Sequence, residues 1–342
     1  MSTSPTVLFS FPSPRATSVN PYTILLAQHV RHAGLHVLYF HWKTALFADY
    51  DVFHVHWPEI LVSGRTPLRQ LVRQGLTALL LVRLTLTRRA LVRTLHNLEL
   101  PDGLSRTQLA LLGLIDRRTD FFIRLNEFTP VEKGAEFSTV PHPDYSDWFV
   151  GFEPAEPVRG QIGFVGRIRR YKGVEALVDA ITTVPREAEL TARIAGYPST
   201  SSLADSLSEL AHDDERISLE FGFVSDGRLV ELVTSSELVV LPYRLMHNSA
   251  AALTALSLDR PVLVPRNPVT TALALEVGQG WVHTYAGDLS TEHITAAITS
   301  LRRSPRTQRP QLARRSWDRT TRSHVEAYAR AITIAQHRSP TP

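Results

Sequence analysis

The chain has 342 residues, of which 43% are hydrophobic and 20% are charged, and its formal net charge is +4. Because a single hydrophobic core stops growing near ~250–300 residues, this length predicts two domains. The absence of cysteine excludes disulfide frameworks, thiolate nucleophiles and cysteine-based zinc sites. The sequence also lacks a secretory signal pattern and the ~18–20 uninterrupted apolar residues of a membrane span. We therefore expect a cytoplasmic protein without a span.

Short apolar runs alternate with helical patterns along the whole chain. The first series lies at 7–11, 37–40, 52–56 and 121–125, and the second lies at 162–165, 192–195, 217–221, 238–241 and 262–264. Strand alternating with helix is typical of βαβ units and parallel sheets. The sequence therefore predicts an α/β fold with two Rossmann-like, doubly wound domains that face an interdomain cleft.

The predicted boundary between the domains is a segment rich in proline and glycine. Residues 151–160 hold two prolines and two glycines and show no periodicity, which is typical of a linker. We expect an N-terminal domain over 1–150 and a C-terminal domain over 151–315. A final helix over 316–336 is expected to pack back on the N-terminal domain.

The most informative motif is the turn from Gly166 to Gly173, which joins a strand to a helix. It carries four cations, Arg167, Arg169, Arg170 and Lys172. The planar guanidinium and the compact ammonium both suit phosphate oxygens. The glycine spacing fits neither a dinucleotide fingerprint nor a Walker loop. The turn therefore predicts a diphosphate site, and a basic surface loop is the alternative.

A second segment, residues 241–249, ends a strand and runs into the small residues 250–252. Asn248 or Ser249 is a natural helix N-cap, and the small side chains behind it leave room for a ligand. The start of a helix favours an anion through its unpaired N–H groups and its dipole. This segment predicts a second contact to a diphosphate, and a merely capped helix is the alternative.

Two predicted strands of the first domain end in histidines. His54 and His56 lie on the same side of one strand with Glu59 just beyond it, and His96 and Asn97 end another. A His-x-His pair with a carboxylate could bind a metal ion, but no convincing further ligand is present, so we expect none. Glu59, His56 and His96 are candidate general bases for an acceptor hydroxyl. A structural histidine and a helix-capping Glu59 are the alternatives.

A basic region extends from Arg65 to Arg93, with seven arginines and no acidic residue. Leucines are interspersed among these arginines, as in a helix that lies at a membrane interface. We therefore expect contact with an anionic membrane surface and no nucleic acid partner. A solvated helix face is the alternative.

The motifs together resemble a known enzyme family. The strand–Gly-Arg-x-x-x-x-Lys-Gly–helix arrangement, the Pro-Tyr-Arg segment at 242–244 and the Asn-Ser pair at 248–249 resemble the donor domain of GT-B glycosyltransferases. The segments 20–22, 51–59, 93–97 and 242–244 resemble a bacterial group described as GDP-mannose:glycolipid β-mannosyltransferase-like, related to exopolysaccharide assembly.

This resemblance implies a role for each domain and for particular residues. The N-terminal domain would bind the acceptor, and the C-terminal domain would bind the nucleotide sugar. Arg167 and Lys172 match the positions that hold the donor diphosphate. The implied donor site also includes Gly166, Tyr243, Arg244, Asn248 and Ser249, and the implied acceptor site includes Asn20, Tyr22, Trp57 and Asn97. The reaction would move a hexose, with GDP-mannose favoured, to a glycolipid or saccharide acceptor without a further cofactor.

One departure from the family pattern bears on mechanism. Retaining GT-B enzymes usually carry Glu-x7-Glu where this chain has Met246 through Thr254, and neither end is acidic here. The difference favours an inverting reaction. We also expect no metal ion, because cationic side chains can stabilise the departing diphosphate, and we expect the protein to be peripheral on the inner face of the cell membrane. A sugar-nucleotide epimerase of the same fold and a catalytically silent nucleotide- or polyanion-binding protein are the alternatives.

Overall fold

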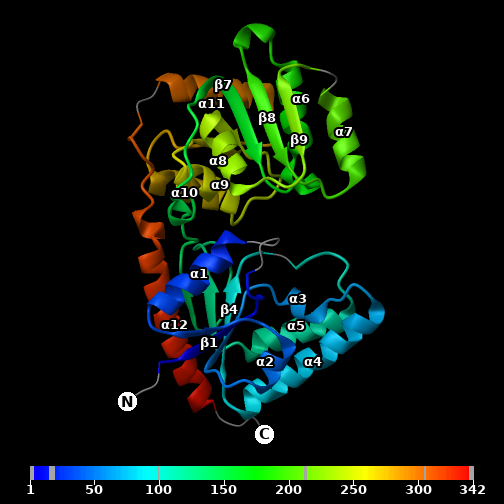
Figure 1. The fold of residues 1–342 in the computed structure, drawn as a ribbon, viewed down its shortest axis with the longest axis vertical. Coiled ribbons are helices and arrows are strands. Elements are labelled where there is room, and N and C mark those ends of the chain that lie inside the picture. The colour runs from blue at the N-terminus through cyan, green and yellow to red at the C-terminus, as the bar shows by residue number, and fades with distance from the viewer. Residues whose placement is uncertain (1–3, 15–19, 99, 212–213, 304–305, 339–342) are drawn as a thin grey trace. The chain divides into compact units, whose positions relative to one another are not determined.

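A computed structural model describes residues 4–14, 20–98, 100–211, 214–303 and 306–338. The chain divides into two compact units, Met1–Pro143 with Arg315–Pro342 and Asp144–Arg314 (Figure 1). The first unit ends before the expected boundary at 150 because Tyr145 already belongs to the second. Its backbone N–H donates a hydrogen bond of 2.8 Å to Ser257 Oγ, which lies in that second unit.

The first unit is built on a six-stranded parallel sheet of order β2-β1-β3-β4-β5-β6. Its strands are β1 (Thr6–Phe9), β2 (His36–Leu38), β3 (Val52–Val55), β4 (Ala90–Leu95), β5 (Phe121–Arg124) and β6 (Phe137–Thr139). The predicted strands of this unit are confirmed, but β6 was not predicted. This strand has three residues and lies at the sheet edge, so it lacks the apolar run that marks a buried strand.

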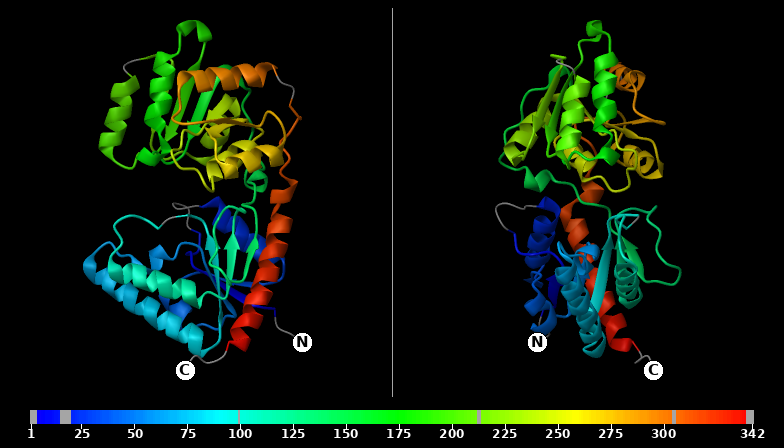
Figure 2. Two further views of the ribbon diagram at one scale, coloured as in Figure 1. Left: turned by 180° about the vertical axis from the view of Figure 1, so that it is seen from behind. Right: turned by 90° about the vertical axis from the view of Figure 1, so that its right-hand side faces the viewer.

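Helices cover both faces of this sheet (Figures 1 and 2). They are α1 (Pro21–His32), α2 (Trp42–Phe47), α3 (Glu59–Val62), α4 (Pro67–Leu86), α5 (Arg106–Arg118) and α12 (Trp317–His337). The core beneath α4 and α5 includes Phe53, Leu80 and Ile115. The C-terminal helix α12 packs against α1 and against β4 and β5, so the end of the chain completes the first unit.

The second unit holds another six-stranded parallel sheet, of order β12-β11-β10-β7-β8-β9. Its strands are β7 (Val158–Val165), β8 (Thr191–Gly196), β9 (Ile217–Phe221), β10 (Ser236–Val240), β11 (Val262–Pro265) and β12 (Val282–Tyr285). Its helices are α6 (Val174–Thr183), α7 (Ser201–Ala211), α8 (Asp226–Ser235), α9 (Ala250–Ser257), α10 (Pro268–Val277) and α11 (Thr291–Arg303). The two parallel α/β units confirm the expected fold class.

The predicted linker at 151–160 is wrong in its last part. Strand β7 already begins at Val158, which pairs with Ser236 of β10. The register shifts just after this pair, and the Gly160 N–H bonds the carboxylate of Glu237 at 2.5 Å. Gly160 sits at this irregularity with φ +80°. The end of the segment therefore contains a glycine, as a loop does, although it lies within a strand.

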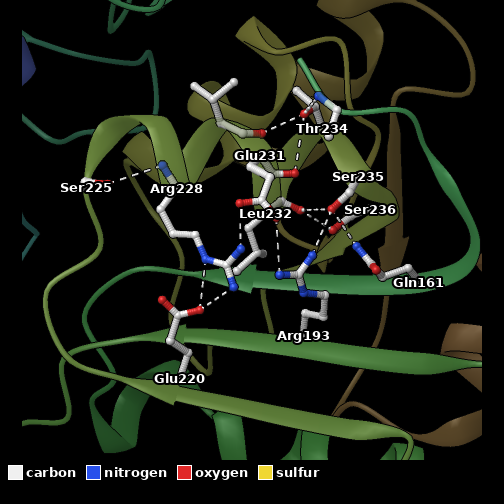
Figure 3. A network of polar contacts seen from close by, with 12 residues as sticks. Gln161, Arg193, Glu220, Ser225, Arg228, Glu231, Leu232, Thr234, Ser235 and Ser236 are labelled. Atoms are coloured by element: carbon white, nitrogen blue, oxygen red, sulfur yellow. Dashed lines mark hydrogen bonds and ion pairs between the residues drawn. The ribbon is translucent and has the colours of Figure 1, made fainter. Parts of the chain in front are cut away.

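Polar side chains fix helix α8 on the second sheet (Figure 3). Arg228 donates from Nη2 to Glu220 of β9 at 2.6 Å and from Nη1 to Glu231 at 2.6 Å. At the other end of the helix, Gln161 of β7 donates to Ser235 Oγ at 2.7 Å. Because β10 follows α8 directly, these bonds help to set β10 beside β7. The strand order reverses between these two strands, and ligands bind at such a reversal in open α/β sheets.

Candidate active site

The basic turn lies at the point where the strand order of the second sheet reverses, between β10 and β7. It leaves the carboxyl end of β7, passes through a short 3-10 helix at Arg170–Lys172 and enters α6 at Gly173. Gly173 has φ +63°, and a side chain there would collide with the Pro242 carbonyl group. Glycine is therefore required at this position by both the left-handed conformation and the close approach of the backbone. The predicted strand–turn–helix arrangement is confirmed.

The four cations of this turn differ in their surroundings. Arg170 lies 3.9 Å from the carboxylate of Glu175 and is largely exposed. Arg167 is also exposed, and no carboxylate of the described residues forms an ion pair with it or with Lys172. Burial, and then the nearby Arg169 and Arg167, lower the pKa of Lys172 to about 8. A bound diphosphate would offset this repulsion between like charges.

The chain after β10 locks this turn in place. The Arg244 N–H donates to the Tyr171 carbonyl oxygen at 3.0 Å, and Lys172 Nζ lies 4.9 Å from the centre of the Tyr243 ring. The Tyr243 hydroxyl in turn hydrogen-bonds the Ser249 side chain. Ser249 caps α9 by accepting from the Ala252 N–H at 3.2 Å, which confirms the predicted N-cap.

These two segments lie together within the second unit and present groups that suit an anion. Arg167 and Lys172 supply positive charge, and the start of α9 supplies backbone donors and the positive end of a helix dipole. Asn248 precedes the cap directly, and the Arg244 side chain is exposed. The arrangement can stabilise a diphosphate whose charge increases as it departs.

The first unit contains a separate pocket of about 240 Å³. It lies where β3 and β4 end, and it is lined in part by the predicted residues His56, Trp57, Glu59, His96 and Asn97. The parallel strands explain this gathering, because their carboxyl ends lie at one edge of the sheet.

Glu59 follows the strand that carries His54 and His56. It is the first residue of α3, and burial raises its pKa, an effect opposed by its own backbone N–H and by Arg93. Arg93, which also lines the pocket, forms an ion pair with Asp116 of α5. Among the described residues, no side chain donates a hydrogen bond to the Glu59 carboxylate. Glu59 is thus placed to accept a proton.

The histidines form a buried, hydrogen-bonded group beside the pocket. His56 Nδ1 lies 2.9 Å from His96 Nε2. His54 uses both ring nitrogens, with Tyr328 Oη and Thr94 Oγ1 each 2.8 Å away. It therefore has no nitrogen left for a metal ion. Over the described ranges, no three acidic, histidine or cysteine side chains are arranged to hold a metal.

Burial keeps these imidazoles neutral. It lowers the pKa of His56 well below the usual range, and the neighbouring histidines His54 and His96 add to the effect. It likewise lowers the pKa of His96 to about 3, with His142 as the next cause. The rings therefore act as hydrogen-bonding groups at neutral pH.

Two residues predicted to bind the acceptor do not line this pocket. Asn20 caps α1 by accepting from the Tyr22 N–H at 3.1 Å. Tyr22 is buried against the rings of His56, His96 and His142. The ring of Tyr22 is thus part of the core beside the histidines. Trp57, by contrast, lines the pocket and stacks on His96 with ring centres 4.5 Å apart.

The structure also places further residues near the two candidate sites, in contacts or positions that the sequence patterns did not indicate. Arg93 and Asp116 join two elements far apart in the chain. In the second unit, Tyr197 and Phe223 are exposed just beyond the carboxyl ends of β8 and β9, at the sheet edge that carries the basic turn. A glycine precedes each aromatic residue, and this repeated pair is a signal that sequence reading could have used.

Helix α4 differs from its expected basic character. Arg73 and Arg83 donate to backbone carbonyl groups of the first unit, and Arg89 pairs with Asp49 and Asp51. Several of the arginines that predicted a positive surface are thus bonded to partners within the first unit. The outward face is instead a stripe of apolar side chains, each 52–79% exposed: Leu68, Leu71, Val72, Leu79, Val82 and Leu86. Along the described parts of the chain, no helix has the length and apolar character to cross a bilayer.

Comparison with known proteins agrees with this architecture. Residues 159–303 match the family model described as glycosyl transferases group 1. Two proteins of Xanthomonas campestris pv. campestris, both named GDP-mannose:glycolipid 4-beta-D-mannosyltransferase, are 39% and 38% identical to this chain over 327 residues. Each alignment covers 96% of this chain and 93% of the relative.

Solved structures of the GT-B fold are similar over nearly the whole chain. A glycosyltransferase from Rickettsia africae has a TM-score of 0.65 at 12% identity, covering 96% of this chain and 99% of that one. The catalytic domain of starch synthase IV from Arabidopsis thaliana has a TM-score of 0.66 at 11% identity, covering 97% and 100%. At such low identity, these likenesses show the fold alone.

Proposed function

Because the chain belongs to the group 1 glycosyltransferases and has the GT-B fold, we propose that it transfers mannose from GDP-mannose to a glycolipid acceptor. The observation that carries this proposal is the basic turn at 166–173, held against Tyr243 and the start of α9. The printed name of the Xanthomonas relatives supports the choice of donor and acceptor. The product would serve cell-surface polysaccharide synthesis.

The second unit would hold the donor. Arg167 and Lys172 would bind the diphosphate oxygens, and Ser249 would present the first turn of α9 to them. These contacts become stronger as the bond to the sugar breaks, because negative charge then collects on the diphosphate. Gly166, Tyr243, Arg244 and Asn248 would shape the same site.

The first unit would bind the acceptor in the 240 Å³ pocket. Trp57 offers an aromatic face for a sugar ring, and Asn97 offers an amide for its hydroxyl groups. A base in this pocket would remove the proton of the attacking hydroxyl, with Glu59, His56 and His96 as the candidates.

Inversion at the anomeric carbon is part of the proposal. The sugar of GDP-mannose is α-linked to phosphate, whereas the name of the relatives specifies a β-linked product. A single in-line displacement accounts for that change. Met246 and Thr254 stand where retaining enzymes usually carry a pair of glutamates. Cationic side chains can stabilise the leaving group, so we propose no metal ion.

The apolar stripe of α4 would attach the protein to the inner face of the cell membrane, where a glycolipid acceptor resides. Six exposed apolar side chains on one helix face favour shallow insertion into the interface. Since several nearby arginines are bonded internally, binding should depend on apolar burial more than on charge. Vesicle flotation tests this: Leu79→Glu should reduce binding, and Thr85→Glu on the same helix should reduce it less. Equal binding by the wild type and Leu79→Glu would reject the attachment.

Transfer itself is tested by supplying GDP- and UDP-sugars with a lipid-linked acceptor and measuring nucleotide release and product. We expect turnover with GDP-mannose and a β-linked product. The Arg167→Ala variant should lose about 100-fold or more of the rate without loss of folding, and Arg170→Ala is the matched control because Arg170 faces Glu175. Full turnover by Arg167→Ala would contradict the donor site.

Two other functions would give different results in the same assay. A sugar-nucleotide epimerase would convert the donor without any acceptor. A catalytically silent protein would bind the nucleotide and never consume it.

A further inference from the structure

The segment 241–249 joins β10 to α9 and has no regular secondary structure. It carries four residues of the proposed donor site, which are Tyr243, Arg244, Asn248 and Ser249. A segment without repeating backbone hydrogen bonds has to be ordered when a ligand binds, unless other groups already fix it. The groups that fix this segment therefore bear on the affinity for the donor.

Three hydrogen bonds fix the segment along its length. Near its start, the Arg244 N–H donates to the Tyr171 carbonyl oxygen, and at its end Ser249 is bonded to Tyr243 and caps α9. Between these two points the carbonyl oxygen of Met246 accepts a hydrogen bond of 2.7 Å from Asn267 Nδ2. Met246 itself is 7% exposed. Asn267 thus holds the middle of the segment.

The strand order explains how Asn267 reaches this segment. Strands β7, β10 and β11 are neighbours in the parallel sheet, so their carboxyl ends lie side by side. The basic turn follows β7, the segment 241–249 follows β10, and Asn267 follows β11 as the N-cap of α10. The bonds to Tyr171 and from Asn267 therefore tie three successive crossovers together at the edge that carries the proposed donor site.

Capping alone does not account for asparagine at this position. Asn267 Oδ1 accepts from the Thr270 N–H at 2.9 Å, but serine and aspartate cap helices about equally well. Asparagine is the one strong cap residue whose side chain also has N–H donors of an amide. The bond to Thr270 fixes Oδ1, so Nδ2 faces the Met246 carbonyl group. The flipped amide would set donor against donor and acceptor against acceptor.

We propose that Asn267 is a positioning residue of the donor site, whose amide holds the Met246 carbonyl and thereby orders the segment 244–249 before the donor binds. This inference rests on the proposed function and deepens it. Asn267 acts without touching the donor. Because the segment is ordered in advance, Ser249 and the first turn of α9 can meet the diphosphate without a further loss of conformational entropy.

The Asn267→Ser variant separates this role from capping, because serine keeps the cap and lacks the amide donor. The dissociation constant of GDP, measured by titration calorimetry on the full chain, should increase about three- to tenfold, as expected for one net hydrogen bond. KM for GDP-mannose should increase similarly, whereas kcat should stay within about threefold. The cost of ordering is shared by the bound ground state and the transition state, so it affects binding alone.

Two matched variants control for the stability of α10. Asn267→Asp keeps a good cap but sets a carboxylate against the Met246 carbonyl group, so it should weaken GDP binding at least as much as Asn267→Ser. Thr270→Val removes the hydroxyl that accepts from the Asn267 N–H at 3.0 Å and leaves the amide bond to Met246 in place. It should lower the thermal midpoint and keep the affinity for GDP. If it weakens GDP binding as much as Asn267→Ser, the effect comes from the cap and the inference fails.

Hydrogen exchange measures the order of the segment directly, without turnover. In the absence of ligand, the peptide covering 243–250 should exchange about three- to tenfold faster in Asn267→Ser than in the wild type. Saturating GDP should remove the difference. Unchanged exchange or unchanged GDP affinity in Asn267→Ser would overturn the inference. If the wild type binds no nucleotide diphosphate, the proposed function fails, whereas exchange without ligand still decides whether Asn267 orders the segment.

Discussion

Acidification should unfold the first unit well before ordinary acid denaturation. Burial lowers the pKa of His142 and of His324 to about 4 each, from 6.5. His54, His56 and His96 are shifted in the same direction. Because these folded-state pKa values are depressed, the unfolded chain binds protons first, so stability is lost as the pH falls below about 6.5.

The size of the effect follows from the two shifts. Each group costs about 1.4 kcal/mol of unfolding free energy per pH unit between its two pKa values. At pH 5, His142 and His324 together therefore remove about 4 kcal/mol, and the other histidines add to this. Since the total stability of a domain is about 5–15 kcal/mol, the first unit should be largely unfolded between about pH 4 and 5.

Hydrogen exchange with mass spectrometry at pH 7.0, 6.0 and 5.0, corrected for intrinsic exchange rates, measures each unit separately. Protection of β3 and β4 should fall steeply, and β7 and β8 of the second unit should change less. His324→Gln keeps a polar side chain that does not titrate, so its stability should fall less steeply by about 1.4 kcal/mol per pH unit. Equal protection of β3 and β4 at pH 7.0 and 5.0 would refute the reasoning.

The remaining predictions concern the donor site and the C-terminal helix. Since the pKa of Lys172 is lowered to about 8, its charge is lost as the pH rises through that value, and KM for the donor should increase there. Lys172→Arg should remove this increase because arginine stays charged, and a persistent increase would point to another group. Tyr243→Phe keeps the ring beneath Lys172 but loses the bond to Ser249, so it should raise KM by roughly tenfold or less. Truncation after Arg315 removes α12 and should abolish soluble expression, whereas truncation after Arg338 should not; normal yield from the shorter chain would contradict the role of α12.

Local sequence patterns were sufficient for the features made by neighbouring residues. The turn from Gly166 to Gly173 needs a strand, a left-handed glycine and a helix in immediate succession. Residues that are close together in the sequence indicate each of these features. Ser249 as an N-cap is equally local, because its hydroxyl bonds an N–H three residues ahead. The buried parallel strands can also be recognised in the sequence as apolar runs, whereas the short edge strand β6 cannot.

Tertiary structure decided everything that depends on distant partners. No local pattern indicates that Arg93 meets Asp116, that Tyr328 from the end of the chain bonds His54, or that Tyr22 turns inward. The arginines near α4 read as a positive surface in the sequence, yet folding gives several of them carbonyl and carboxylate partners. The histidines are the clearest case. Their spacing predicted candidate bases, but only folding buries them, which lowers the pKa of each ring, and brings His56 Nδ1 to 2.9 Å from His96 Nε2.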